Sequence, residues 1–260
     1  MVSGFGFQNR IPRKGNFSFR RKKEKSVICV RLPMGGFGVF HGYYFLTATL
    51  QEPVNTRMDD LLIELLTRVL CDTAPPTADF CFIFGQTADN QASVLQKAEQ
   101  LLAQNKVKKV GFVQTQAMSG YPGFAAWQDT LAGKGVRLGQ MEGVSVENPA
   151  LLHTLIEAQA MARHVREKGY CTVCVLAAPF HQLRAFMTAV TAATAHNVTA
   201  QLFSVPGVAL PWQEQVAHSQ GNTMGTRQEL IAGELERIGK YIRKGDLATV
   251  ETVLKYLDKR

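Results

Sequence analysis

The chain has 260 residues, of which 46% are hydrophobic and 19% are charged. This composition excludes a globally disordered protein, a collagen-like chain and a coiled coil, and the length suits one α/β domain or at most two small ones. The net charge of +8 would normally suggest nucleic acid or an acidic membrane surface as a partner. However, residues 1–31 carry nine basic residues and one acid, while the rest of the chain carries 20 of each. The body is therefore neutral, and we expect no specific nucleic-acid partner.

The first 50 residues divide into a basic arm and an apolar leader. Residues 10–25 are rich in Arg and Lys without apolar periodicity, which is typical of a disordered arm. Residues 32–50 contain no Asp, Glu, Lys or Arg, and a stretch of about 20 apolar residues after a basic flank is the form of a membrane anchor. Four glycines and Pro33 lower the helix propensity of this stretch. Three interpretations stay open: a poorly ordered leader on a cytoplasmic protein, an amino-terminal anchor in the inner membrane, or an over-long start, since Met34 and Met58 lie closer to the first predicted helix.

From residue 55 onward, apolar periodicity predicts helices that alternate with short strands. Helices are expected over 55–71, 91–104, 124–131, 150–168, 183–195, 228–243 and 247–257, and strands over 78–84, 110–113, 136–141, 170–177 and 199–204. This alternation predicts an α/β fold, a Rossmann-like three-layer sandwich with a mostly parallel sheet and helices on both faces. We expect residues 51–260 to form this single domain, which ends in carboxyl-terminal helices.

The five cysteines are irregularly spaced, which argues against a disulfide framework and favours a reducing compartment. Cys171 and Cys174 match the C-x-x-C pattern of redox and zinc sites. They fall in a predicted strand, however, where residues three apart point to opposite faces. Since no second pair of Cys or His completes a zinc site, we expect structural thiols and no metal site.

Ligands of doubly wound sheets bind beyond the carboxyl ends of the strands, where the strand order reverses. Four loops are therefore the candidate sites. The loop from Gly85 to Asp89 lacks the glycine patterns of dinucleotide sites and P-loops. The segment 114–120 offers hydroxyl and backbone N–H groups. The other two loops precede the helix starts near residues 154 and 181. The residues that we expect to bind ligand are Gly85, Gln86, Thr115, Ser119, Gly120, Thr154, Glu157, His181 and Arg184.

The spacing of His181 and Arg184 allows both side chains to face one cleft at a helix start. Histidine suits proton transfer or hydrogen bonding, and arginine suits an anionic group. The structural alternative is that His181 caps the helix while Arg184 pairs with a surface carboxylate, and spacing alone does not decide between them. His153, Thr154 and Glu157 alone favour a structural role. His164, His196 and His218 have no companions in sequence, so no role is assigned to them.

At these loops the sequence resembles the YdcF/SanA/ElyC family, a family without an established general reaction. The similar segments run in the family's order over roughly residues 56–240 and comprise Asp79 to Gly85, Ala98 to Leu101, Ser119 and Gly120, Thr154 to Ala158, and Ala178 to Ala185. The segment 229–237 is similar to the YdcF branch in particular. The sequence departs from the family pattern at His153, at Phe124, where an acid is usual, and at Gln91 or Ser93, where a base is usual.

The resemblance implies a Rossmann-like domain that binds a small nucleotide-like ligand in the cleft at the strand ends. S-adenosylmethionine is the leading candidate, because the YdcF branch is associated with it. Transferase and hydrolase activities are both compatible with this resemblance, and whether the protein is an enzyme stays open. The alternative is a membrane-anchored factor of envelope biogenesis, as in the SanA and ElyC branches. G-x-S-x-G is absent, so the sequence does not predict a classical serine hydrolase.

Overall fold

The computed structural model describes residues 56–148, 150–218 and 223–260, all within one compact unit, Asn55–Arg260. The predicted basic arm and apolar leader, residues 1–50, lie outside the described residues, as does the choice between leader and membrane anchor. Within the described ranges, every helix is too short or too polar to cross a bilayer.

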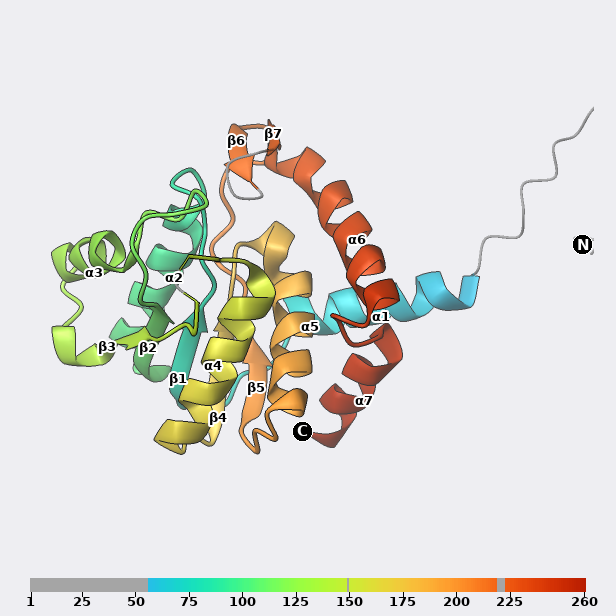
Figure 1. The fold of residues 1–260 in the computed structure, drawn as a ribbon, viewed down its shortest axis with the longest axis horizontal. Helices are drawn as coiled ribbons and strands as arrows, with labels where there is room; N and C mark the ends of the chain where they lie inside the picture. The colour runs from blue at the N-terminus through green and yellow to red at the C-terminus, as the bar shows by residue number, and fades with distance from the viewer. Residues whose placement is uncertain (1–55, 149, 219–222) are drawn as a thin grey trace, which may run out of the picture. The chain divides into compact units, whose positions relative to one another are not determined.

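Five parallel strands form the central sheet in the order β3-β2-β1-β4-β5 (Figure 1). Cys81 of β1 lies opposite Val110 of β2 on one side and Cys174 of β4 on the other. The chain builds outward from β1 to β3 and then returns to β4, so the strand order reverses between β1 and β4. The strands are β1 (Ala78–Ile83), β2 (Val107–Val113), β3 (Met141–Val144), β4 (Thr172–Leu176) and β5 (Gln201–Ser204).

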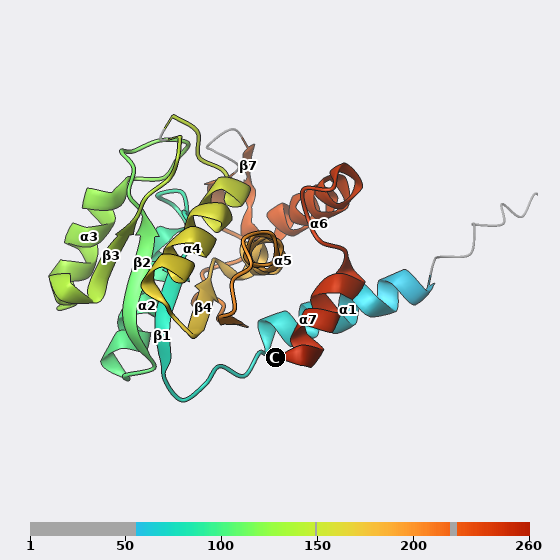
Figure 2. The same cartoon turned by 60° about the horizontal axis from the view of Figure 1, so that its bottom comes forward.

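Helices cover both faces of the sheet (Figures 1 and 2). Phe80 of β1 packs against His164 of α4, whereas Phe112 of β2 packs against Trp127 of α3 on the opposite face. The predicted Rossmann-like α/β sandwich is therefore confirmed. The helices are α1 (Thr56–Leu70), α2 (Gln91–Ala103), α3 (Phe124–Gly133), α4 (Thr154–Lys168), α5 (Pro179–Ala195), α6 (Arg227–Lys244) and α7 (Val250–Lys259), and a 3-10 turn spans Leu138–Gln140.

Helix α5 is the central helix of its layer, since α1, α4, α6 and α7 all pack against it. Most of its residues are buried, among them the polar side chains of His181, Gln182 and Arg184. It begins at Pro179, four residues earlier than predicted, because proline fits the first turn of a helix, where no backbone N–H is needed. His181 therefore lies in the first turn of α5.

Two features differ from the prediction. The third strand was expected over 136–141 but covers Met141–Val144, after the 3-10 turn, so that prediction is wrong in position. A hairpin of β6 (Gln215–His218) and β7 (Thr223–Thr226) was not predicted, because each strand has only four residues and half of these residues are polar. The hairpin matters because it brings His218 to the strand ends.

The cysteines that the structure describes are all free. Cys171 is exposed just before β4, whereas Cys174 is buried in the strand, so the two thiols of the C-x-x-C pattern lie in different environments. Among the described residues, no group of His, Cys, Asp or Glu side chains is placed to hold a metal ion.

Candidate functional site

A cavity of about 440 Å³ opens beside the carboxyl ends of β1 and β4, where the strand order reverses. Its walls come from the loop after β1, the loop after β2, the starts of α4 and α5, the hairpin and the carboxyl-terminal part of α6. The polar residues that line it are Gln86, Thr87, Ser119, Tyr121, His153, Thr154, Glu157, His181, Arg184, Thr188, His218, Arg237, Tyr241 and Asp246.

Seven of the nine predicted ligand-binding residues line this cavity: Gly85, Gln86, Ser119, Thr154, Glu157, His181 and Arg184. Thr115 and Gly120 are not among its lining residues. Thr115 is buried, and its carbonyl accepts the backbone N–H of Phe124 at the start of α3. Gly120 has a φ of 78°, which suits the tight turn of its loop. These two residues therefore shape the loop after β2.

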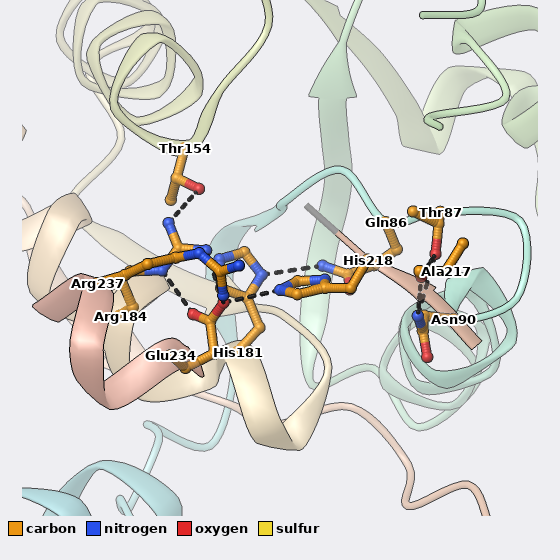
Figure 3. Close-up of polar contacts among 10 residues, drawn as sticks. All are labelled: Gln86, Thr87, Asn90, Thr154, His181, Arg184, Ala217, His218, Glu234 and Arg237. Atoms are coloured by element: carbon orange, nitrogen blue, oxygen red, sulfur yellow. Dashed lines mark hydrogen bonds and ion pairs between the residues drawn. The ribbon is translucent and has the colours of Figure 1, made fainter. Parts of the chain in front are cut away.

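A buried ion cluster forms one side of the cavity (Figure 3). We call it the Glu234 cluster; it comprises Glu234, Arg184, Arg237 and His218. Arg184 donates from Nε and from one terminal nitrogen to the two carboxylate oxygens of Glu234, at 2.5 and 3.1 Å. Arg237 at 2.9 Å and His218 Nε2 at 2.7 Å reach the same carboxylate.

The surroundings of Glu234 keep its carboxylate ionised. Burial by itself would raise the pKa of this carboxyl, but Arg184 and the hydrogen bond from His218 outweigh burial and hold the pKa below its usual range. Arg184 also donates to Thr154 Oγ1 at 2.7 Å. Arg184 thus joins α4, α5 and α6, and its partner is a buried carboxylate rather than a surface one.

The imidazole of His181 has one ring nitrogen engaged and one without a partner. Gln86 Nε2 donates to the carbonyl of Phe84 at 3.3 Å. The same nitrogen faces His181 Nδ1, also at 3.3 Å (Figure 3). A carbonyl only accepts, so the Gln86 nitrogen is the donor to both groups, and Nδ1 of the neutral ring is an acceptor. The ring proton therefore lies on Nε2. Nε2 is buried and has no hydrogen-bond partner among the described residues.

His181 is held in its neutral form. Burial, followed by the positive charge of Arg184, lowers the pKa of His181 well below its ordinary value. His181 does not cap α5, because Ala178 occupies that position. Its Nε2–H is consequently a buried donor on a residue that lines the cavity.

Glu157 lies in the first turns of α4 and is buried. The backbone N–H of Gly85 donates to its Oε2 at 2.6 Å, and Oε1 has no hydrogen-bond partner among the described residues. Burial raises the pKa of Glu157 to about 7, while the Gly85 N–H and the charge of Arg184 act in the opposite direction. Glu157 therefore exchanges a proton near neutral pH.

The hairpin is bound to the loop after β1. Thr87 Oγ1 and Asn90 Nδ2 both donate to the carbonyl of Ala217, at 2.8 and 3.1 Å (Figure 3). The Ala217 N–H donates to Asp89 at 2.7 Å. Arg227 adds a bond from Nε to Asn90 Oδ1 at 2.9 Å. These bonds place the neighbouring His218 at the cavity.

Sequence reasoning missed His218, Glu234 and Arg237. No sequence pattern indicates a role for His218, whereas in the structure its Nε2 is hydrogen-bonded to Glu234. Glu234 and Arg237 both lie in the segment 229–237, and their i, i+3 spacing on a helix was the available signal. The sequence alone does not show that α6 packs against α5.

Next to the cavity, the lining residue Tyr121 packs edge-on against Trp127, with ring centroids 4.8 Å apart. Trp127 is fully buried, and its ring also packs against Phe112. The side chain of Tyr121 thus separates the buried ring of Trp127 from the cavity.

No protein-family model matches the chain, and neither a curated protein nor a solved structure matches it.

Proposed function

We propose that this protein binds a small nucleotide-like ligand in the cavity at the carboxyl ends of β1 and β4, with S-adenosylmethionine as the leading candidate. The observation that carries the proposal is the position of a 440 Å³ cavity at the reversal of strand order. Small-molecule sites commonly have volumes of about 300–1,000 Å³, and doubly wound sheets bind ligands at this position.

The charges at the cavity favour a ligand without a phosphate chain. Arg184 and Arg237 supply two positive charges, both paired with the buried Glu234, and the carboxyl groups of Glu157 and Asp246 line the same cavity. No positive excess is therefore available for a polyphosphate. S-adenosylmethionine carries one more positive than negative charge, which suits this balance. Its carboxylate matches the unused donors of Arg237, and its amine matches the carboxylates.

Thermal unfolding with and without ligand tests the proposal. We expect S-adenosylmethionine, S-adenosylhomocysteine, sinefungin or adenosine at millimolar concentration to raise the Tm, because a ligand that binds only the folded state stabilises it by about 2.7 kcal/mol at 100 times its Kd. The variant His181→Phe removes the Nε2 donor and should lose this effect. The matched control His196→Phe alters the residue at the carboxyl-terminal end of α5 and should keep it. No rise with any of the four compounds would refute the proposal.

A further inference from the structure

Two side chains at the cavity have capacity that the protein leaves unused. His181 has a buried Nε2–H without a partner, and Glu157 has one carboxylate oxygen without a hydrogen bond among the described residues. Of the groups near them, Arg184 is bound to Glu234 and Thr154, and Thr188 donates to the carbonyl of Arg184. A buried donor without a protein partner is costly, and on a residue that lines a cavity it is available to an atom bound there.

The two unused groups are held by consecutive residues at the end of β1. Gly85 binds Glu157 through its N–H, and Gln86 faces His181 through its amide. At Gly85 a Cβ atom would lie 3.2 Å from Glu157 Oε2, so glycine allows the carboxylate to approach this closely. One short loop therefore orients both groups at the same strand end.

We propose that the cavity catalyses the hydrolysis of a carboxylic ester, with Glu157 as the general base that activates water and His181 Nε2–H as the donor that stabilises the oxyanion. The proposal rests on the proposed binding function only in using the same cavity, because S-adenosylmethionine has no carboxylic ester bond and is not the substrate. It goes beyond binding in assigning a reaction and a substrate class.

Water is the nucleophile because the cavity offers no activated side chain for that role. Among the residues that the structure describes, no cysteine lines the cavity. The hydroxyl of Thr87 donates to a backbone carbonyl, as does that of Thr188, and Thr154 accepts from Arg184. Ser119 has no hydrogen bond to a basic side chain among the described residues. Attack by water on a carbonyl requires a base that takes the proton of water and a donor that stabilises the oxyanion. Glu157, which is only partly ionised at neutral pH, and the neutral ring of His181 are two such groups.

The step is balanced without any further reactant. The carboxylate of Glu157 takes a proton from water as the water oxygen bonds to the acyl carbon. The C=O electron pair moves to the carbonyl oxygen, which accepts a hydrogen bond from His181. When the pair returns, the bond between the acyl carbon and the leaving oxygen breaks, and Glu157 returns the proton to that oxygen. The products are a carboxylic acid and an alcohol.

A neutral ester suits the site better than a phosphoester. The two arginines are balanced by carboxylates, so the cavity offers no excess positive charge to a phosphate dianion. His181 donates as a neutral ring and stabilises charge that develops on one oxygen. The comparison between acyl and phosphoryl substrates is therefore part of the test.

The experiment measures hydrolysis of p-nitrophenyl acetate by the full chain, with p-nitrophenyl phosphate as the alternative probe. We expect turnover of the acetate, with a rate that rises with pH through an apparent pKa near 7. Glu157→Gln should lower kcat by about 10²–10⁴-fold and abolish this rise. Glu147→Gln makes the same change at a carboxylate that pairs with Arg163 away from the cavity, and its rate should equal that of the original protein.

His181→Phe should lower kcat by about 10²–10³-fold, as expected for an oxyanion donor. Gln86 is a positioning residue. Gln86→Leu should change which ring nitrogen of His181 carries the proton, and nitrogen NMR spectra measure this change. The loss in kcat should be smaller than that of His181→Phe. Heavy-oxygen water should label the carboxylic acid product without an acyl-enzyme in the mass spectrum.

An acetate hydrolysis rate that is equal in the original protein and in Glu157→Gln overturns the proposal, as does turnover of the phosphate alone. Thermal-shift data separate this failure from that of the binding function. Stabilisation by an adenosine derivative without Glu157-dependent hydrolysis leaves binding intact and removes the reaction.

Discussion

Glu157 and Glu234 are two buried carboxyl groups near one cavity, with opposite surroundings. Glu234 accepts hydrogen bonds from Arg184, Arg237 and His218, and its pKa lies below the usual range. Glu157 accepts one hydrogen bond, from the backbone of Gly85, and burial raises its pKa to about 7. A carboxylate with several charged partners contributes structure, whereas a poorly partnered one retains the capacity to exchange a proton. The comparison therefore indicates that the poorly partnered carboxyl group, Glu157, is the one to examine for chemistry.

The largest expected effect comes from breaking the Glu234 cluster. Arg184→Met leaves a buried carboxylate without its bidentate partner and should lower the free energy of unfolding by about 3–5 kcal/mol, measured by urea denaturation. Arg163→Met is the control, because its partner Glu147 has a side chain that is 79% exposed, and we expect a loss below about 1 kcal/mol. A loss for Arg184→Met as small as that of the control would contradict the structural role of the cluster.

The second prediction concerns Glu157 and pH. Its folded pKa is raised, so its contribution to stability is complete below the unfolded value of 4.5 and is lost as pH rises through about 7. This loss corresponds to about 3 kcal/mol. Glu157→Gln, which stays neutral, should therefore be more stable than the original protein at about pH 8 and equal to it at about pH 4. Thermal unfolding across this range measures the difference.

The charged group that acts on Glu157 in that titration is Arg184 from α5, and the hydroxyl of Tyr121 is nearby. Glu147→Gln serves as the control, with a stability difference that does not vary over the same pH range. A Glu157→Gln variant that is less stable at high pH would show that Glu157 is paired in the folded protein and so removes the contrast with Glu234.

The third prediction tests whether His218 belongs to the cluster. His218→Phe removes the 2.7 Å hydrogen bond to Glu234 and should cost about 1.5–3 kcal/mol, the range for bonds to charged groups. His196→Phe, at the end of α5, should cost less. Equal losses in the two variants would mean that His218 contributes packing against Phe180 rather than a bond to Glu234.

The smallest effect is expected at Arg237. Its side chain is 24% exposed, and Glu234 retains Arg184 and His218 when it is removed. Arg237→Met should therefore lower the free energy of unfolding by less than about 1 kcal/mol. A loss as large as that of Arg184→Met would show that the cluster acts as one unit instead of through its buried pair.

The helices, the strands and the location of the cavity at the strand ends were predicted more completely from the sequence than the residues that surround the cavity. Hydrophobic periodicity predicts the alternation of helices and strands. In a parallel sheet with one reversal of strand order, the polar loops at the carboxyl ends of the strands converge at that reversal. His181 and Arg184 were found because both lie on one helix, within a turn of each other. Glu234 was not found, because its position depends on how α6 packs against α5, and no local pattern encodes that contact.

The hairpin shows the same limit. Its four-residue strands carry polar side chains, and its position depends on long-range bonds from Thr87 and Asn90 to the Ala217 carbonyl. Thr115 and Gly120, which do not line the cavity, show a related limit. Both lie in a correctly predicted loop, but a loop at the right strand end presents only some of its residues to the cavity.

The position of Trp127 gives the protein an internal optical reporter. The chain contains two tryptophans, and the other, Trp212, is 39% exposed. In a Trp212→Phe variant all the tryptophan emission would come from Trp127, whose ring contacts Tyr121 at the cavity wall. A ligand that displaces Tyr121 would alter the environment of the indole and hence the fluorescence. Occupancy of the cavity can then be followed in solution without labelling either molecule.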